Sequence, residues 1–220
     1  MLVNKRDSLR VLATKRKETF WPPHCSIGDY HDGAYECEFV SPYTKSAGNV
    51  DSDIFVLLQD WSSDDYLRGS LDADCINYGL TRSFPTNRRL VELLKEHFGA
   101  RLEDIYATNL FPFVKNGGIS SCIPREDLVR AANQFALPQI DIVRPKLVIC
   151  LGLNTFNAIS EACGLSRAKC MNEAVSSPFR FQDACIWCQA HTGARGQNNR
   201  GRERVSEEWR RMKEYYLYGT

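Results

Sequence analysis

Three residues that can do chemistry each stand at the end of a predicted buried strand. Asp60 follows the apolar residues 54–58, and Asn109 and His191 end or follow two further strands. A carboxylate, a carboxamide and an imidazole together can hold a ligand by hydrogen bonds and move protons. Each residue alone is more often a turn former or a helix cap. Their shared position after predicted strands is what predicts a functional site.

Four segments are predicted to be buried strands, because their apolar residues run with little interruption. They are residues 54–59, 104–109, 146–151 and 184–190. Helical patterns lie between and after them, at residues 88–98, 124–135, 153–163 and 205–218. This alternation is typical of a parallel sheet with helices on both faces. We therefore expect a three-layer α/β/α fold with a central four-stranded parallel sheet.

Local signals set the expected ends of the helices. Thr86 is the expected N-cap of the helix at 88–98, and Gly99 is its expected stop. Pro124 opens the next helix, and Pro138 disturbs its continuation. In open α/β sheets the ligand binds beyond the carboxyl ends of the strands. The three candidate residues stand at those ends, so we expect them around one pocket.

Length and composition indicate one globular domain of ordinary size. The chain has 220 residues, of which 43% are hydrophobic and 25% charged, which argues against wholesale disorder. Its longest apolar runs are too short to span a bilayer, and its basic beginning lacks the apolar core of a secretory signal. Nine cysteines, an odd number, indicate free thiols in a reducing compartment. We expect a cytoplasmic protein without a membrane partner.

Charge is spread unevenly along the chain, although the net charge is only +1. Residues 1–18 contain six basic and two acidic residues, and residues 191–213 contain seven basic residues and three glutamates. Residues 51–75 contain seven aspartates and one arginine. The basic segments indicate either a polyanion partner or solvated helix faces. We expect residues 1–50 to form a basic arm and irregular lead-in that packs on a domain at residues 51–220.

The order of motifs along residues 54–200 resembles the uracil-DNA glycosylase superfamily, of which this chain would be a divergent member. In that family the first strand ends in G-Q-D-P-Y, a second ends in Asn, and the last ends in H-P-S before a loop that enters the DNA. The corresponding segments here are QDW at 59–61, YATN at 106–109, PKLVICLG at 145–152 and HTGARGQNNR at 191–200. The first and last of these segments are the specific parts of the resemblance.

The resemblance implies a DNA base-excision glycosylase that hydrolyses the N-glycosidic bond of uracil or a related damaged base. The base must leave the duplex to reach the enzyme, so base flipping comes first. By family role, Asp60 orients or activates the attacking water, Asn109 reads the edge of the base, and His191 binds the base carbonyl as negative charge develops. A carboxylate beneath the sugar can stabilise the oxocarbenium-like cation, so this chemistry needs no metal or other cofactor.

The same resemblance implies further binding residues. Gln59, Trp61 and Phe84 would bind the base with Asn109, and Phe84 would stack on it unless it packs in the core. The DNA-binding residues would be Thr192, Gly193, Arg195, Gln197, Arg200 and Arg202. Arg195 or Gln197 would fill the gap that the flipped base leaves in the stack. We expect a monomer that binds DNA containing uracil or a damaged base and is associated with the nucleoid.

The sequence departs from the family pattern at several positions. Leu58 stands where the family has its first Gly, and Trp61 and Ser62 stand where it has Pro and Tyr. In the familiar branch that Tyr excludes the methyl group of thymine, so the substrate range of this chain is open. Thr192 and Gly193 replace the Pro and Ser that follow the family's His.

Two other functions stay open from the sequence. A superfamily member that has lost catalysis could bind nucleic acid or a nucleotide. Alternatively, Asp60, Asp64 and Asp65 could hold Mg²⁺ in a phosphoester hydrolase, although no further acidic residues follow the other strands. The pair Cys185 and Cys188 has a metal-ligand spacing, but an extended strand turns the two side chains to opposite faces. We expect neither a metal nor a cofactor.

Overall fold

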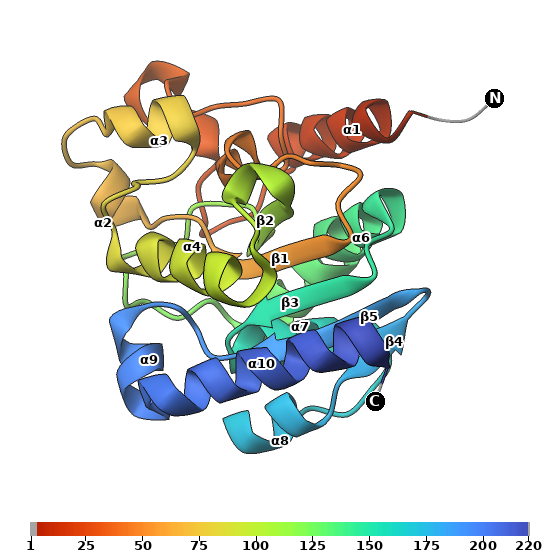
Figure 1. The fold of residues 1–220 in the computed structure, drawn as a ribbon. Helices are drawn as coiled ribbons and strands as arrows, with labels where there is room; N and C mark the ends of the chain where they lie inside the picture. Colours follow the sequence, from red (N-terminus) through yellow and green to blue (C-terminus); the bar gives the residue numbers. More distant parts are fainter. Residues whose placement is uncertain (1–3, 220) are drawn as a thin grey trace.

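The computed structural model describes residues 4–219 and contains a central five-stranded sheet (Figure 1). The strands are β1 (Ile54–Asp60), β2 (Tyr106–Phe111), β3 (Leu147–Leu151), β4 (Phe179–Phe181) and β5 (Ala184–Gln189). Four of them pair in parallel in the order β2-β1-β3-β5, and β4 pairs antiparallel with β5 at the edge. The fold is α/β as expected. The expected number of four strands is wrong, because β4 adds a fifth.

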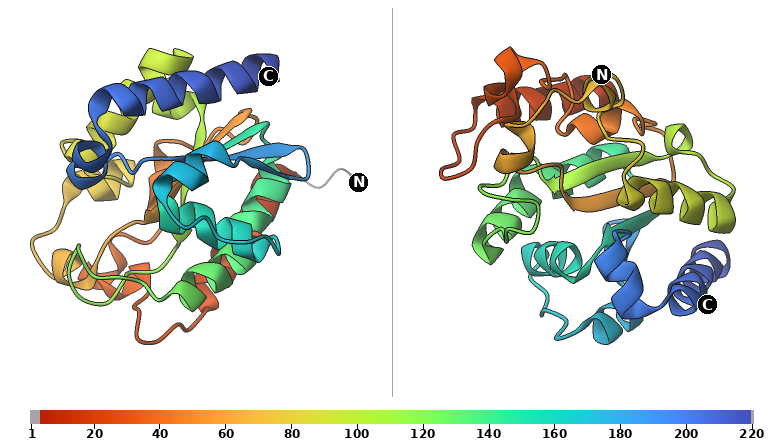
Figure 2. Two further views of the ribbon diagram at one scale, coloured as in Figure 1. Left: turned by 90° about the horizontal axis from the view of Figure 1, so that it is seen from below. Right: turned by 90° about the vertical axis from the view of Figure 1, so that its left-hand side faces the viewer.

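Helices cover both faces of the sheet (Figures 1 and 2). They are α1 (Lys5–Glu18), α2 (Asp64–Leu67), α3 (Ala73–Tyr78), α4 (Pro85–Phe98), α5 (Arg125–Ala131), α6 (Leu137–Val143), α7 (Leu153–Ala162), α8 (Met171–Ser176), α9 (Ala194–Arg200) and α10 (Arg202–Tyr218), with the 3-10 turns η1 (Ile27–Asp29), η2 (His31–Gly33), η3 (Pro42–Lys45) and η4 (Leu102–Asp104). Helices α4 and α10 pack on one face, and α5, α6 and α7 cover the other, with α1 outside α6. Among residues 4–219, no helix combines the length and apolar character needed to cross a membrane.

Strand β1 lies in the interior of the sheet and is buried on both sides. Phe55 and Leu57 belong to the core beneath α5, α6 and α7, whereas Ile54, Val56 and Leu58 belong to the core beneath α4 and α10. A strand that buries both faces has no polar side to alternate with its apolar side. This double burial is the physical reason for the apolar run at its place in the sequence.

The predicted helices are present, but two details of their bounds differ from expectation. Thr86 is not the N-cap of α4, because the helix already begins at Pro85, whose ring fixes a helical φ angle, and Phe84 precedes it. The second predicted helix continues beyond Pro138. It passes from α5 through a π-helical segment, η5 (Ala132–Ala136), into α6. Pro138 has no N–H to donate to the preceding turn, and the wider π turn accommodates the missing hydrogen bond.

Helix α1 is held against the rest of the protein by charged side chains. The Arg16 side chain is fully buried, and its guanidinium donates hydrogen bonds to both carboxylate oxygens of Glu36, at 2.6 and 2.5 Å. At the start of the helix, Lys5 donates to the carbonyl oxygen of Val143 at the end of α6, at 3.0 Å. The helical part of the basic N-terminal segment is therefore anchored to the core. The division of the chain into an arm at residues 1–50 and a domain at residues 51–220 stays a prediction.

Gly79 determines how closely α3 approaches η3. It caps the end of α3 with a φ of +73°, and a β-carbon added there would lie only 1.7 Å from the carbonyl oxygen of Pro42. Its own carbonyl oxygen accepts a hydrogen bond from the Trp61 indole N–H at 2.8 Å. Trp61 and Tyr43, the neighbour of Pro42, both line a cavity beside the sheet. The close contact at Gly79 therefore fixes one wall of that cavity.

We predict that Gly79→Ala costs about 2–5 kcal/mol of unfolding free energy, because it combines a left-handed backbone conformation with a steric overlap. Gly99→Ala is the matched control, since Gly99 caps α4 with a φ of +64° and has open space where the β-carbon would go. That control should lose only about 1–2 kcal/mol. Urea denaturation followed by circular dichroism measures both losses, and equal losses would contradict the proposed contact.

Candidate active site

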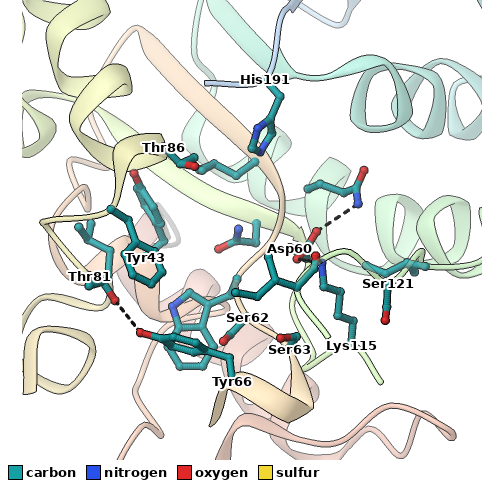
Figure 3. A pocket seen from close by; sticks show the side chains of 18 of the residues that line it. Tyr43, Asp60, Ser62, Ser63, Tyr66, Thr81, Thr86, Lys115, Ser121 and His191 are labelled. Atoms are coloured by element: carbon teal, nitrogen blue, oxygen red, sulfur yellow. Dashed lines mark hydrogen bonds and ion pairs between the residues drawn. The ribbon is translucent and has the colours of Figure 1, made fainter. Parts of the chain in front are cut away.

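A cavity of about 360 Å³ opens at the carboxyl edge of the sheet (Figure 3). Asp60 reaches it from the end of β1, Asn109 from within β2, and His191 from the segment that follows β5. The other predicted base-binding residues, Gln59, Trp61 and Phe84, line the same cavity. The structure therefore brings together all the residues that the sequence proposes for catalysis and base binding.

Both carboxylate oxygens of Asp60 are engaged by neighbouring side chains. Gln59 donates a hydrogen bond from Nε2 to Oδ1 at 3.1 Å, and Lys115 Nζ lies 2.9 Å from Oδ2. The Lys115 side chain is only 6% exposed and that of Asp60 is 17% exposed. An ion pair at this depth is less screened by water than a surface pair. Asp60 is therefore held in one orientation with a positive charge directly beside it.

Asn109 is fully buried and belongs to the lining of the cavity. The Ser41 hydroxyl, which is also buried, donates to Asn109 Oδ1 at 2.6 Å. Among the described residues, Asn109 Nδ2 has no hydrogen-bond partner. A buried donor without a partner is costly, and it becomes favourable when a ligand supplies the acceptor. With this assignment of the amide, Ser41 orients Asn109 toward a ligand.

The His191 ring is oriented by the backbone two residues later. The Gly193 N–H donates to His191 Nδ1 at 3.0 Å, so Nδ1 carries no proton and the neutral ring must hold its proton on Nε2. A β-carbon at Gly193 would stand 2.9 Å from Nδ1, so the glycine permits this approach. His191 is exposed to solvent as a residue, but the protein atoms packed around its ring desolvate the imidazole and lower its pKa. The charge of Asp60 opposes this lowering, and that of Lys115 reinforces it.

Four aromatic side chains form one wall of the cavity: Tyr43, Trp61, Tyr66 and Phe84. Tyr66 is fixed through its hydroxyl, which donates to Asp72 at 3.1 Å, and its ring centre lies 5.6 Å from that of Phe84. Phe84 is 38% exposed, so it stands at the mouth of the cavity and not in the core. Flat apolar surfaces of this kind can stack against a planar ring.

The predicted DNA-binding residues divide into exposed and internal ones. Arg195 and Arg202 are exposed, Gly193 is half-buried, and Thr192 is buried. Gln197 is buried, where it accepts from Arg89 and donates to the His191 carbonyl oxygen. Arg200 is committed to an internal ion pair with Glu208. Arg195 is therefore a better candidate than Gln197 for a residue that enters the DNA, and Gln197 and Arg200 instead hold helix α9 in place.

Basic side chains also surround a smaller hollow of about 210 Å³ beside the cavity. Arg88 and Arg89 at the start of α4 and Arg202 at the start of α10 line it together with Thr192. Arg88 and Arg202 are exposed. The sequence had indicated Arg202 but not the two arginines of α4, because those lie in an ordinary amphipathic helix. The fold thus brings basic side chains from two helices together around one hollow, where Glu92 pairs with Arg89.

The candidate site includes other residues that the sequence analysis does not single out. Lys115, Tyr43 and Tyr66 line the cavity, and Ser41 contacts it only through its hydrogen bond to Asn109. Lys115 follows β2 by four residues, beyond the strand-end positions that the sequence analysis considered. Ser41, Tyr43 and Tyr66 lie in irregular or short helical segments with no periodic pattern. Lys115 could have been proposed from the sequence, because it directly follows the apolar stretch 110–114. For the other three, no signal in the sequence indicates the cavity.

The carboxylates and thiols do not form a metal-binding cluster in the described part of the chain. The Asp64 carboxylate accepts from Tyr30 at 2.6 Å and pairs with Arg68 at 2.9 Å, whereas that of Asp60 pairs with Lys115. Within residues 4–219, no three His, Cys, Asp or Glu side chains gather in a way that could hold a metal ion. Cys185 and Cys188 belong to core clusters on opposite faces of the sheet. Neither the aspartates nor this cysteine pair therefore supplies a ready-made ligand set.

We predict that His191 titrates below the ordinary pKa of 6.5 and is neutral with its proton on Nε2. Because the folded-state pKa is lowered, the group contributes stability that is complete above about pH 6.5 and is lost as pH falls through the folded-state value. Nitrogen NMR of the imidazoles, of which the chain has four, resolves the tautomer and the midpoint. His191→Gln serves to assign the signal. A midpoint above 6.5 or a proton on Nδ1 would contradict this arrangement.

Comparison with known proteins gives one distant similarity. No protein-family model matches the chain. A type-4 uracil-DNA glycosylase of Sulfurisphaera tokodaii is 23% identical over 128 residues, which is 57% of this chain and 57% of the relative. The chain thus spans little more than half the length of this curated relative. The similarity points to a distant relationship with the uracil-DNA glycosylase superfamily.

Proposed function

We propose that this protein is a DNA base-excision glycosylase that hydrolyses the N-glycosidic bond of uracil or a related damaged base after base flipping. The observation that carries the proposal is the meeting of Asp60, Asn109 and His191 around one cavity. The cavity volume of about 360 Å³ lies in the range of pockets that enclose small ligands. The distant similarity to a type-4 uracil-DNA glycosylase supports the same chemistry.

Asp60 stabilises the sugar as the glycosidic bond breaks. The departing base leaves positive charge on the sugar ring, and an ionised carboxylate close to that ring lowers the energy of the cation. Its partners Gln59 and Lys115 hold the carboxylate in a fixed position, so that little reorganisation is needed during the reaction. The same carboxylate orients the water that attacks the sugar carbon.

His191 stabilises the departing base. The neutral ring with its proton on Nε2 donates a hydrogen bond to a base carbonyl oxygen, and this bond strengthens as negative charge develops there. The lowered pKa of His191 favours the neutral ring, which is the form that leaves Nδ1 free to accept from Gly193. The imidazole therefore acts as a fixed hydrogen-bond donor and not as a proton donor.

Asn109 and the aromatic wall select the base. The free Nδ2–H₂ group of Asn109 donates to a carbonyl oxygen on the edge of the base, while the second lone pair of Oδ1 accepts from a ring N–H. Uracil offers this pair of groups side by side. Phe84 stacks on the ring from the mouth of the cavity. Because Trp61 and Ser62 replace the residues that exclude a methyl group in the family's familiar branch, bases other than uracil also belong to the candidate substrates.

Exposed arginines hold the DNA around the cavity. Arg88, Arg195 and Arg202 can bind backbone phosphates, which gives salt-dependent and sequence-independent affinity. Arg195, in α9, is the candidate for the residue that occupies the gap left by the flipped base. A monomer suffices for this mode of binding, since each proposed contact comes from one chain.

We predict that Asp60→Asn slows base release from a uracil-containing oligonucleotide by about 100-fold or more, because the carboxylate charge is lost. His191→Ala should slow it by about 100- to 1,000-fold, as expected for the loss of one preorganised hydrogen-bond donor. Asp53→Asn is the matched control, since Asp53 forms a similar ion pair with Lys146 at the opposite edge of the sheet. Free uracil is measured in the presence of EDTA, and duplex binding is measured in parallel.

The same measurements separate the alternatives. Salt-sensitive DNA binding without release of any base from a panel of uracil, thymine, hypoxanthine and xanthine would show a binding protein that has lost catalysis. Activity that disappears in EDTA would indicate a metal-dependent hydrolase. Full activity in both Asp60→Asn and His191→Ala would remove the assigned site.

We predict that Ser41→Ala lowers the preference for uracil over cytosine by about tenfold, because Asn109 loses the hydrogen bond that fixes its amide. Thr44→Val is the matched control, since the Thr44 hydroxyl also binds β2, at the carbonyl oxygen of Ala107, without touching Asn109. The ratio of kcat/KM for the two bases is the readout, and Ser41→Thr should restore it. An unchanged ratio in Ser41→Ala would show that Asn109 is oriented by other contacts.

A further inference from the structure

Lys115 is a buried amine inside the candidate active site. In base hydrolysis only its charge is used, to hold Asp60, and its capacity as a nucleophile is not. Its side chain is 6% exposed, and its Nζ contacts Asp60 Oδ2 at 2.9 Å and donates to the carbonyl oxygen of Ile119. Desolvating a lysine is expensive, and a lysine amine inside a desolvated site can act as a nucleophile once a neighbouring base takes its proton. Figure 3 shows Lys115 and Asp60 projecting into the same cavity as His191.

We propose that Lys115 captures the abasic sugar left by base excision as a covalent imine, which adds a lyase activity to this cavity. The proposal rests on the proposed glycosylase function, because that reaction supplies the abasic sugar. The substrate class is a deoxyribose abasic site in DNA, whose open-chain form carries an aldehyde at C1′. Aldehydes condense with primary amines, and Lys115 is the lysine that lines the cavity.

The position of Lys115 beside Asp60 brings its amine close to C1′. A carboxylate that stabilises charge on the sugar, or aligns water for attack on it, stands about 3–3.5 Å from the reacting carbon or one water away. Lys115 Nζ is 2.9 Å from that same carboxylate. The flexible four-carbon stem of lysine can cover the remaining distance by rotation about its bonds.

The ion pair supplies the proton transfers that imine formation needs. The Lys115 ammonium passes one proton to Asp60, and the neutral amine attacks the C1′ aldehyde carbon, forming a C–N bond. Asp60 returns that proton to the former aldehyde oxygen and then carries a second proton from the attacking nitrogen to the same oxygen. The oxygen leaves C1′ as water, and a protonated imine remains. Ammonium and aldehyde are thus converted into iminium and water, with no oxidant, reductant or metal.

Strand cleavage follows from the same intermediate. The iminium makes the C2′ protons acidic, and Asp60, again a carboxylate, removes one of them. The electron pair forms a C2′=C3′ double bond, and the C3′–O bond breaks so that the 3′ phosphate leaves with its bonding electrons. Hydrolysis of the imine then releases the unsaturated sugar and restores the Lys115 amine.

A preformed abasic duplex with sodium borohydride tests this proposal without requiring base excision. Borohydride reduces an imine to a stable secondary amine, so the wild-type protein should become covalently linked to the DNA. A reduced adduct blocks tryptic cleavage after Lys115, so cleavage after Arg101 and Arg125 then gives a peptide at residues 102–125 in which Lys115 is the only lysine. Mass spectrometry should therefore find the sugar adduct on that peptide.

Two variants make the test specific. Lys115→Arg keeps the positive charge beside Asp60 but removes the primary amine, and it should abolish the adduct while abasic-duplex binding, measured without borohydride, is retained. Lys146→Arg is the matched control, because Lys146 forms an exposed ion pair with Asp53 at the opposite edge of the sheet. It should be trapped as efficiently as the wild type.

The possible results separate this proposal from the glycosylase function. Uracil release without any adduct at saturating abasic DNA overturns the role of Lys115 and leaves base excision intact. An adduct on residues 102–125 without uracil release supports the imine and contradicts base excision. An adduct that maps to exposed lysines, or that forms equally in Lys115→Arg, overturns the imine at Lys115.

Discussion

The parallel pairing of β1 with its two neighbours is the constraint on which the cavity depends. Within this pairing Leu58 lies opposite Asn109, and Asp60 lies opposite Phe111. The next pair, β3 with β5, ends with Gln189 opposite Leu151, two residues before His191. A parallel register brings the carboxyl ends of strands to one edge whatever their separation in sequence. Residues from distant parts of the chain therefore meet because their strands are paired, and a slip of one residue would turn each side chain to the wrong face.

The acidic segment at residues 51–75 carries less unpaired negative charge than its sequence suggests. Most of its aspartates are neutralised by basic partners, in the pairs Asp51–Lys5, Asp53–Lys146, Asp60–Lys115, Asp64–Arg68 and Asp74–Arg82. Exposed arginines of α4 and α10, Arg88 and Arg202, instead line one hollow together. Charge counted along a chain thus differs from charge presented on a surface, because ion pairs join segments that are far apart in sequence.

The sequence predicts those parts of the fold that have strong local patterns. The four parallel strands and the helices α4, α7 and α10 follow from apolar runs and helical periodicity. Strand β4 could not be predicted, because it has three residues, none of them fully buried, and it exists only through its pairing with β5. The site divides in the same way. Asp60 and His191 could be predicted from the sequence, because they adjoin strand ends. Ser41 could not, because it lies in an irregular segment that only the tertiary fold brings to Asn109.

The groups around the cavity differ in how firmly they are held. Asp60, Asn109 and His191 each have a neighbour that fixes their orientation, and Tyr66 is fixed by Asp72. Preorganised groups of this kind stabilise developing charge without having to rearrange during the reaction. Phe84 is instead exposed at the mouth, and Arg195 is exposed on α9. If these side chains bind a ligand, as the proposed function requires, ordering them costs conformational entropy that the ligand must offset. The groups proposed for catalysis are therefore held before binding, whereas those proposed for ligand entry are the least constrained.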